Sequence, residues 1–134
     1  MTDPQRDDEL GVTTKSSPRS VDDTLQRLQE ILTSKGVKIF DVIDQSGEAG
    51  DVGLSLRPTT LVIFGNPRAG TPIMNAAPLA ALDLPLKLLI WSDESGTKVS
   101  YYSPSEIATR HHLSDDLAQG LGALDVVSDA LVTP

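Results

Sequence analysis

The sequence predicts an α+β fold, a two-layer sandwich in which helices pack on one face of a largely antiparallel sheet. Three observations support this prediction. A segment near the N-terminus has apolar residues at helical spacing, several later segments are short and aliphatic, and two of these flank a tight glycine-containing turn. The predicted order is strand, helix, two strands, helix, hairpin and C-terminal helices.

The N-terminal residues are polar, and the sequence predicts order only after them. Residues 1–10 hold alternating charges and one proline, so they are expected to form a disordered lead-in. Residues 11–134 are expected to form a single α+β domain, because a second domain would have too little surface to bury. The β-branched residues of 12–15 favour a first strand.

The most clearly marked element is a helix over residues 21–35. Ser20 and Asp23 have capping-box spacing at its start, with Asp in place of the usual Glu, and Gly36 is a C-terminal stop signal. Its apolar residues recur at helical spacing and form one stripe, made of Val21, Leu25, Leu28, Ile31 and Leu32. This stripe predicts a helix that packs one face on the sheet.

The middle of the chain predicts two strands separated by a loop. Residues 37–44 alternate like a strand, and residues 45–53 hold three glycines and are expected to form a loop with room for one helical turn. Residues 54–58 are expected to be extended. Residues 61–64 are uninterruptedly apolar, which is typical of a strand covered on both faces and predicts the centre of the sheet. Replacing Ile63 by Ala is then expected to cost about 2–5 kcal/mol.

The remaining segments predict a turn, a hairpin and helices. Asn66-Pro67 is typical of a turn, and Thr71 is expected to cap a helix that Pro72 opens and that ends near Ala77. The hairpin and the C-terminal helices are expected at residues 86–91, 98–102, 104–110 and 115–132.

The composition excludes several classes of function. With 19 acids against 11 Lys and Arg, the net charge is −8, which would repel a nucleic-acid backbone. There is no cysteine, so thiolate metal sites and cysteine nucleophiles are excluded. The sequence shows neither a secretory signal nor an apolar stretch of the ~20 residues that span a bilayer. A cytoplasmic protein that binds neither nucleic acid nor membranes is expected.

Motifs spaced along the chain match a known family as a set. They lie at Phe40–Asp44, Gly53–Pro58, Phe64–Pro67, Gly70–Pro72, Asp83–Lys87 and Arg110–His111. This set resembles the bacterial and archaeal domain-of-unknown-function family 302, and the similarity runs from about Val12 to the last helix.

The resemblance implies a compact two-layer fold that is often dimeric, and it implies no activity. Family members commonly have a histidine after the Asp at position 44, whereas this chain has Gln45, which puts any role of that histidine in doubt here. A homodimer is expected, since a short antiparallel sheet also leaves edges that need cover.

One stretch is unusual in its charge. Residues 52–82 contain no acid in an otherwise acidic protein, and they carry two cations. They also hold a glycine-bounded loop that leaves a buried strand and enters a helix N-terminus, a geometry that favours anions. The predicted ligand-binding residues are Arg57, Gly65, Asn66, Arg68, Gly70 and Thr71.

The same features have simpler explanations. The loop can be only a turn, the acid-free stretch can reflect a buried centre, and Arg68 can pair with a surface acid. Thr71 stands where a phosphate loop requires Lys, which disfavours a nucleoside triphosphatase. His111 and His112 are helix neighbours that do not share one metal, and a cation at a helix C-terminus is their simpler role. No catalytic residue, metal ligand or cofactor is predicted.

The sequence thus predicts a dimeric binding or scaffold domain for a small anionic molecule or a protein partner. The alternative is a small enzyme acting on an anionic metabolite, with Arg57 and Arg68 positioning the substrate. An enzyme should show a strongly perturbed acid or base in a cleft near residues 57–72, whereas a scaffold should show that cleft filled and its arginines paired.

Overall fold

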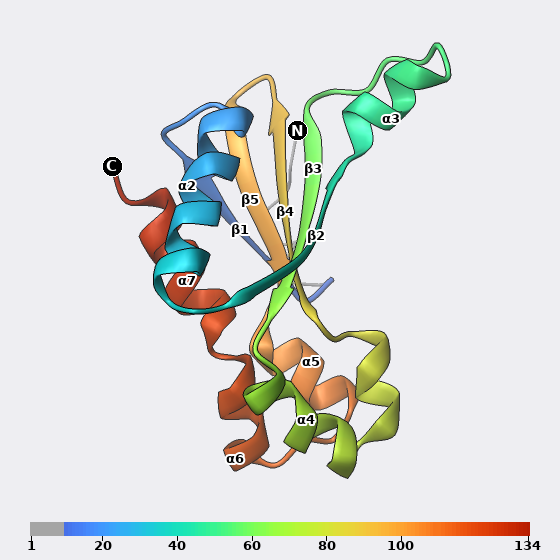
Figure 1. Ribbon diagram of the computed structural model, residues 1–134, viewed down its shortest axis with the longest axis vertical. Helices are drawn as coiled ribbons and strands as arrows, with labels where there is room; N and C mark the ends of the chain where they lie inside the picture. Colours follow the sequence, from blue (N-terminus) through green and yellow to red (C-terminus); the bar gives the residue numbers. More distant parts are fainter. Residues whose placement is uncertain (1–9) are drawn as a thin grey trace.

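The computed structural model describes residues 10–134 and shows an α+β sandwich built on a five-stranded antiparallel sheet of order β1-β5-β4-β3-β2 (Figure 1). The strands are β1 (Val12–Ser17), β2 (Lys38–Asp44), β3 (Thr59–Gly65), β4 (Leu86–Asp93) and β5 (Gly96–Tyr102). The helices are α2 (Val21–Ser34), α3 (Gln45–Asp51), α4 (Pro67–Ala76), α5 (Pro104–Arg110), α6 (Asp115–Ala118) and α7 (Ala123–Val132), with 3-10 helices η1 (Pro78–Leu82) and η2 (Gln119–Leu121). The predicted fold class is confirmed. The predicted lead-in lies outside the described residues, except for Leu10, which begins a turn.

Helices α2 and α7 cover one face of the sheet, as Figure 1 shows, and the main core lies between them and the strands. Helix α2 begins as predicted, because the Ser20 side chain accepts a hydrogen bond from the backbone N–H of Asp23. Its residues Leu28 and Leu32 are fully buried. Burying each such leucine contributes about 1.5–3 kcal/mol.

The strand over residues 61–64 forms as predicted, but it is covered on one face only. Val62 and Phe64 are 0% exposed and belong to the core, whereas Leu61 and Ile63 point to the other face and are half-buried. The prediction of cover on both faces is therefore wrong for the described chain. The central strand is β4, with β3 between it and the edge strand β2.

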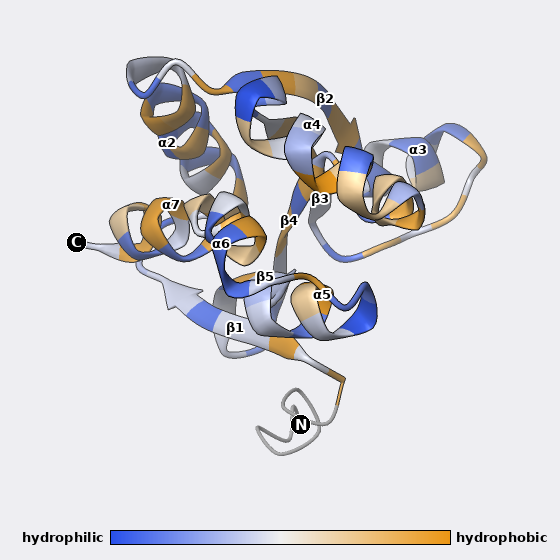
Figure 2. Cartoon of the chain, turned by 90° about the horizontal axis from the view of Figure 1, so that it is seen from below, coloured by the Kyte–Doolittle hydropathy of each residue, from blue (hydrophilic) through white to orange (hydrophobic). Residues whose placement is uncertain are grey.

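The predicted loop over residues 45–53 is instead mostly helix α3. The Asp44 side chain caps it by accepting a hydrogen bond from the N–H of Gly47. This bond and one from the Ser46 hydroxyl hold the pKa of Asp44 below its usual value. No residue of α3 is buried. Helix α3 and the segment after it project from the body (Figure 1), on the side of the sheet opposite α2 and α7 (Figure 2).

The single predicted helix over residues 115–132 is broken into α6, η2 and α7. The break lies where η2 packs against α4, with Gly120 at the contact. A Cβ atom on Gly120 would lie 3.2 Å from both the carbonyl oxygen of Ala69 and the Cδ1 of Ile73. This close approach is a tertiary feature that helical periodicity does not reveal.

Among residues 10–134, no helix is both long and apolar enough to cross a membrane. This agrees with the sequence, in which every apolar run is short.

Candidate functional site

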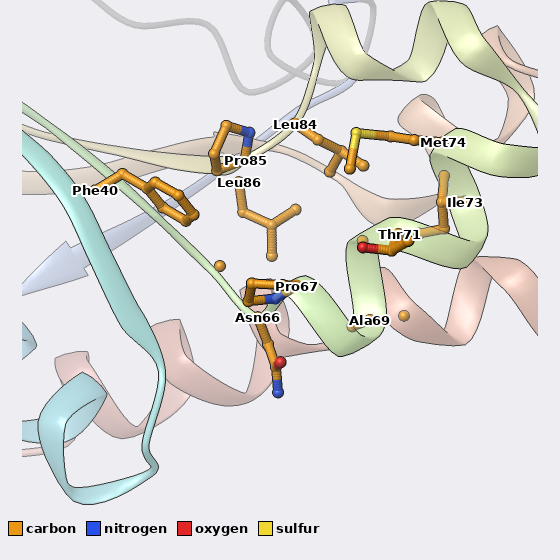
Figure 3. A pocket seen from close by; sticks show the side chains of 13 residues that line it. Phe40, Asn66, Pro67, Ala69, Thr71, Ile73, Met74, Leu84, Pro85 and Leu86 are labelled. Carbon is orange, nitrogen blue, oxygen red and sulfur yellow. The ribbon is translucent and has the colours of Figure 1, made fainter.

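A pocket of about 210 Å³ opens where β3 ends and α4 begins (Figure 3). Strand β2 contributes its bulged residue Phe40, the segment before β4 contributes a second wall, and η2 touches the pocket through a glycine. The lining residues are Phe40, Gly65, Asn66, Pro67, Ala69, Gly70, Thr71, Ile73, Met74, Leu84, Pro85, Leu86 and Gly120.

Helix α4 starts earlier than the sequence analysis predicts. Asn66 is its N-cap, with an extended backbone and a side chain that accepts from the N–H of Arg68 at 2.9 Å. Pro67 takes the first helical position, which suits its fixed φ and missing N–H. The predicted start at Thr71 and Pro72 is wrong, because Asn-Pro already supplies a complete cap, and Pro72 lies inside the helix.

This capping changes what the helix terminus offers a ligand. The N–H groups of Ala69 and Gly70 both donate to the Asn66 carbonyl, at 2.9 and 3.0 Å. Together with the Arg68 N–H, the donors of the first turn are therefore already bonded. An anion at this site would have to be held mainly by side chains rather than by free backbone N–H groups.

The structure brings four of the predicted ligand-binding residues together, since Gly65, Asn66, Gly70 and Thr71 all line this pocket. In Figure 3 the Asn66 side chain points away from Phe40 and Leu86, in keeping with its capping role.

The two predicted arginines lie apart from each other. Arg68 is exposed on the first turn of α4, beside the pocket but outside its lining. Arg57 lies beyond the other end of β3, about 20 Å away along the strand, in an open hollow with Trp91 and Lys98. Within residues 10–134, neither arginine takes part in an ion pair. The alternative in which Arg68 pairs with a surface acid is therefore not seen.

The pocket is mainly apolar and has no charged residue in its lining. The acid-free stretch of the sequence thus includes much of one pocket wall. A cation that the sequence analysis missed lies beside it: Lys38 pairs with Gly65 across the sheet, and its Nζ lies 4.8 Å from the centre of the Phe40 ring. The site therefore combines an apolar hollow with one nearby cation, Lys38, and Arg68 lies in the chain between the lining residues Pro67 and Ala69.

The other missed lining residues come from distant segments. Phe40 lies at a register shift between Ile39 and Asp41, which removes it from the simple alternation of β2. Leu84 and Pro85 precede the hairpin and were marked in the sequence only by the resemblance motif Asp83–Lys87, whereas Leu86 begins β4 and was also predicted as part of the hairpin.

A polar cluster holds this second wall in place. Arg110 binds both carboxylate oxygens of Asp83, at 2.9 and 3.0 Å, and the Nε2 of His111 lies 2.5 Å from one of them. Arg110 also pairs with Glu106 one turn earlier on α5. The resemblance motifs at 83–87 and 110–111 are thus in direct contact.

The electrostatics of the cluster are those of a structural ion pair. Partial burial by itself raises the pKa of Asp83, but hydrogen bonds from His111 and Arg110 outweigh it and lower that pKa. His112 is exposed, with a left-handed backbone at φ 52°. Within residues 10–134, no three His, Asp or Glu side chains gather as a metal site.

Comparison with known proteins decides the family. The model of the family described as "Domain of unknown function DUF302" matches residues 12–131. The chain belongs to this family. The DUF302 match covers β1 through most of α7, so it includes the pocket and the Asp83 cluster.

A solved DUF302 structure supports the fold. The crystal structure of an uncharacterized conserved protein DUF302 from Bacillus stearothermophilus aligns with a TM-score of 0.77 and 18% sequence identity, covering 92% of this chain and 96% of that one. At this identity, the likeness concerns the fold alone.

The curated relatives are longer proteins. A protein named fluoride-specific ion channel FluC 1, from Brucella suis biovar 1 (strain 1330), is 38% identical over 124 residues, which are 92% of this chain and 46% of that protein. The protein of the same name from Brucella abortus biovar 1 (strain 9-941) has the same identity, with 43% of its length matched. This chain therefore spans less than half of these relatives.

Proposed function

We propose that this DUF302 domain binds a small molecule with an apolar body and an anionic group, in the pocket at the end of β3. The observation that supports this most directly is an apolar hollow of about 210 Å³ with Lys38 beside it, and with Arg68 between two of its lining residues in the chain. The hollow would bury the ligand's hydrocarbon part, and the cations would hold its charged end.

The size of the pocket limits the ligand. Drug-sized sites have volumes of about 300–1,000 Å³, so this one suits a ligand of roughly ten non-hydrogen atoms. A short-chain or aromatic carboxylate has this size, and benzoate is a suitable probe.

Two observations favour binding over the alternatives. The pocket lining contains no titratable side chain, which disfavours the small enzyme with an acid or base in this cleft. The hollow is open, and Arg68 has no ion-pair partner within residues 10–134, which disfavours a scaffold with a filled cleft. A homodimeric, cytoplasmic protein is part of the same proposal.

A series of probes with one ring and three head groups tests the ligand class. We expect calorimetry to show binding of benzoate, at least tenfold weaker binding of benzyl alcohol, and none of benzylamine. Equal affinity for all three would show that the pocket recognises only the ring. Binding of acetate as tight as that of benzoate would show that the apolar hollow plays no part.

Variants locate the site. Arg68→Ala and Lys38→Ala should each weaken benzoate at least tenfold while stability barely changes. Gly70→Leu should fill the hollow and abolish binding, because a Cβ at Gly70 would meet only Met74 and Leu84, at 3.7 and 3.9 Å, and a longer side chain would enter the pocket. The variant should fold, because Leu is a better helix former than Gly. Unchanged affinity in all three variants would place binding elsewhere.

A second candidate ligand is fluoride itself, suggested by the names of the Brucella relatives. Titration with sodium fluoride against sodium chloride tests it. Heat with fluoride alone would favour this candidate, whereas equal or absent heats would remove it.

A further inference from the structure

The face of the sheet opposite α2 and α7 carries an apolar patch. We call it the open face, defined by Ile43, Leu61, Ile63, Leu89 and Trp91. Cross-strand register places Leu61 between Ile43 and Leu89, with Ile63 and Trp91 on the same face in the adjoining rows. None of the five belongs to the core or packs against it. Figure 2 shows α2 and α7 on the other side of the strands.

The chain's own N-terminal segment is chemically unsuited to cover this patch. Residues 1–9 read Met-Thr-Asp-Pro-Gln-Arg-Asp-Asp-Glu, with four acids and a single large apolar side chain, that of Met1. Such a segment cannot supply the apolar area that would match five large side chains.

The open face carries charges that complement a second copy of itself. In one row across the sheet, Asp41 is opposite Ile63, which is opposite Lys87. Opposite charges thus flank a central apolar residue at equal spacing. Within residues 10–134, neither charge takes part in an ion pair.

We propose that the open face is the docking surface for a second copy of this chain, related by a two-fold axis that runs along β3. That axis keeps the rows in register and lays β2 of each copy over β4 of the other. Lys87 then faces Asp41 of the partner subunit, and Ile63 faces Ile63 of the partner subunit. This self-complementarity is what a two-fold interface requires, and face-to-face sheets pack about 10 Å apart.

The projecting segment completes the interface. The three strands that this axis superposes, β2, β3 and β4, give over three rows a face of roughly 300 Å², less than the about 800 Å² that each partner buries in a standard interface. The arm, residues 45–58, adds the apolar side chains of Val52, Leu54 and Leu56, which are 72%, 67% and 46% exposed. The same axis carries the arm of each copy toward the partner's hollow of about 950 Å³ beside Trp91 and Lys98.

This inference rests on the homodimer of the proposed function but not on its ligand. Sedimentation velocity of the full chain at micromolar concentration should show a dimer of the 14.3 kDa subunit. Lys87→Glu and Asp41→Lys should each weaken the dimer about tenfold or more, because each places like charges opposite one another twice. The double variant should restore the dimer.

Mixing the two single variants gives the most stringent experiment. In their heterodimer one charge pair is native and the other is reversed, so an equimolar mixture should dimerise more tightly than either variant alone. Ile63→Asp should weaken the dimer about 100-fold by burying an unpaired charge. The matched control is Leu82→Asp, since Leu82 is 78% exposed and lies off the open face, and it should leave the dimer intact.

Several results would overturn the inference. They are a wild-type monomer at all concentrations, a dimer that survives both Ile63→Asp and the single charge reversals, or a monomer that dimerises only after residues 1–9 are deleted. Benzoate binding is measured separately at the other site. A wild-type monomer with retained benzoate binding therefore contradicts the homodimer and its interface but not the ligand. A dimer that survives the open-face variants contradicts the interface alone, and a dimer that does not bind benzoate contradicts the ligand alone.

Discussion

The two faces of the sheet use the same strands and largely the same residue types, yet only one of them is covered by helices. Val62 and Phe64 are fully buried, whereas Leu61 and Ile63, their immediate neighbours, are half-buried on the open face. An apolar side chain on a strand therefore indicates that its face of the sheet is stabilised by burial, but it does not indicate which helix or which other chain buries it. On one face the cover is the chain's own α2 and α7, and on the other we propose that it is a second copy.

The largest expected effect is on the free energy of unfolding, which should depend on the face of the sheet that carries the substitution. Phe64→Ala should destabilise the protein by about 3–5 kcal/mol, because it opens a cavity in the core. Ile63→Ala should cost only about 1 kcal/mol in dilute solution, less than the about 2–5 kcal/mol expected from the sequence, because its side chain is partly in water already. Urea unfolding at low protein concentration measures both.

If Phe64→Ala and Ile63→Ala lower the free energy of unfolding equally at low protein concentration, the proposed difference between the two faces is wrong, because Ile63 would then be buried within a single chain. If the cost of Ile63→Ala instead grows with protein concentration, the comparison is sharpened, since only the dimer buries that face.

A smaller effect is expected from two adjacent tyrosines. Tyr101 is 4% exposed, and its hydroxyl donates to Asp125 at 2.6 Å and accepts from Ser128 at 3.0 Å. Tyr102 is 50% exposed on the other face. Tyr101→Phe should cost about 1–2 kcal/mol, because it removes the hydroxyl that bonds the Asp125 carboxylate and one of the hydrogen bonds of the Ser128 side chain. Tyr102→Phe should stay within about 0.5 kcal/mol. Thermal unfolding of the two variants measures these losses of stability. Equal losses would contradict the placement of Tyr101 in the core and of Tyr102 on the other face.

The pH dependence of the same residue gives an independent check. Burial, followed by the bond to Asp125, raises the pKa of Tyr101 above its usual 10.0. The folded state therefore holds this proton more tightly, so the stabilisation is complete below about pH 10 and is lost as pH rises through the raised pKa. The advantage of the wild type over Tyr101→Phe should shrink above about pH 10, and an advantage that grows there would be inconsistent with this network.

The smallest expected effect is spectroscopic. Trp91 is the only tryptophan of the chain, and it lies on the open face with its Nε1 donating to the Ser100 hydroxyl at 2.9 Å. Its emission should shift slightly to the blue, and acrylamide quenching should fall, as protein concentration rises. Neither should change in Ile63→Asp. Emission independent of concentration in the wild type would indicate that no partner covers this face.

Local signals in the sequence determined much of the fold. The helical stripe and cap of α2 and the hairpin of β4 and β5 were predicted, because each depends on residues close in the chain. The glycine-bounded loop predicted after β3 is instead the first turn of α4. The same loop located four of the pocket's lining residues, and the spaced motifs identified the family.

Tertiary structure alone decided the rest. Phe40, Lys38 and the 84–86 wall meet the loop through sheet register and through the contact of Asp83 with Arg110 and His111, which are 27 and 28 residues away in the chain. Arg57 and Arg68 are separated because β3 runs straight between them. Which apolar face the helices cover was also undetermined, since alternation along a strand assigns residues to two faces but does not show where another element, or another chain, will pack.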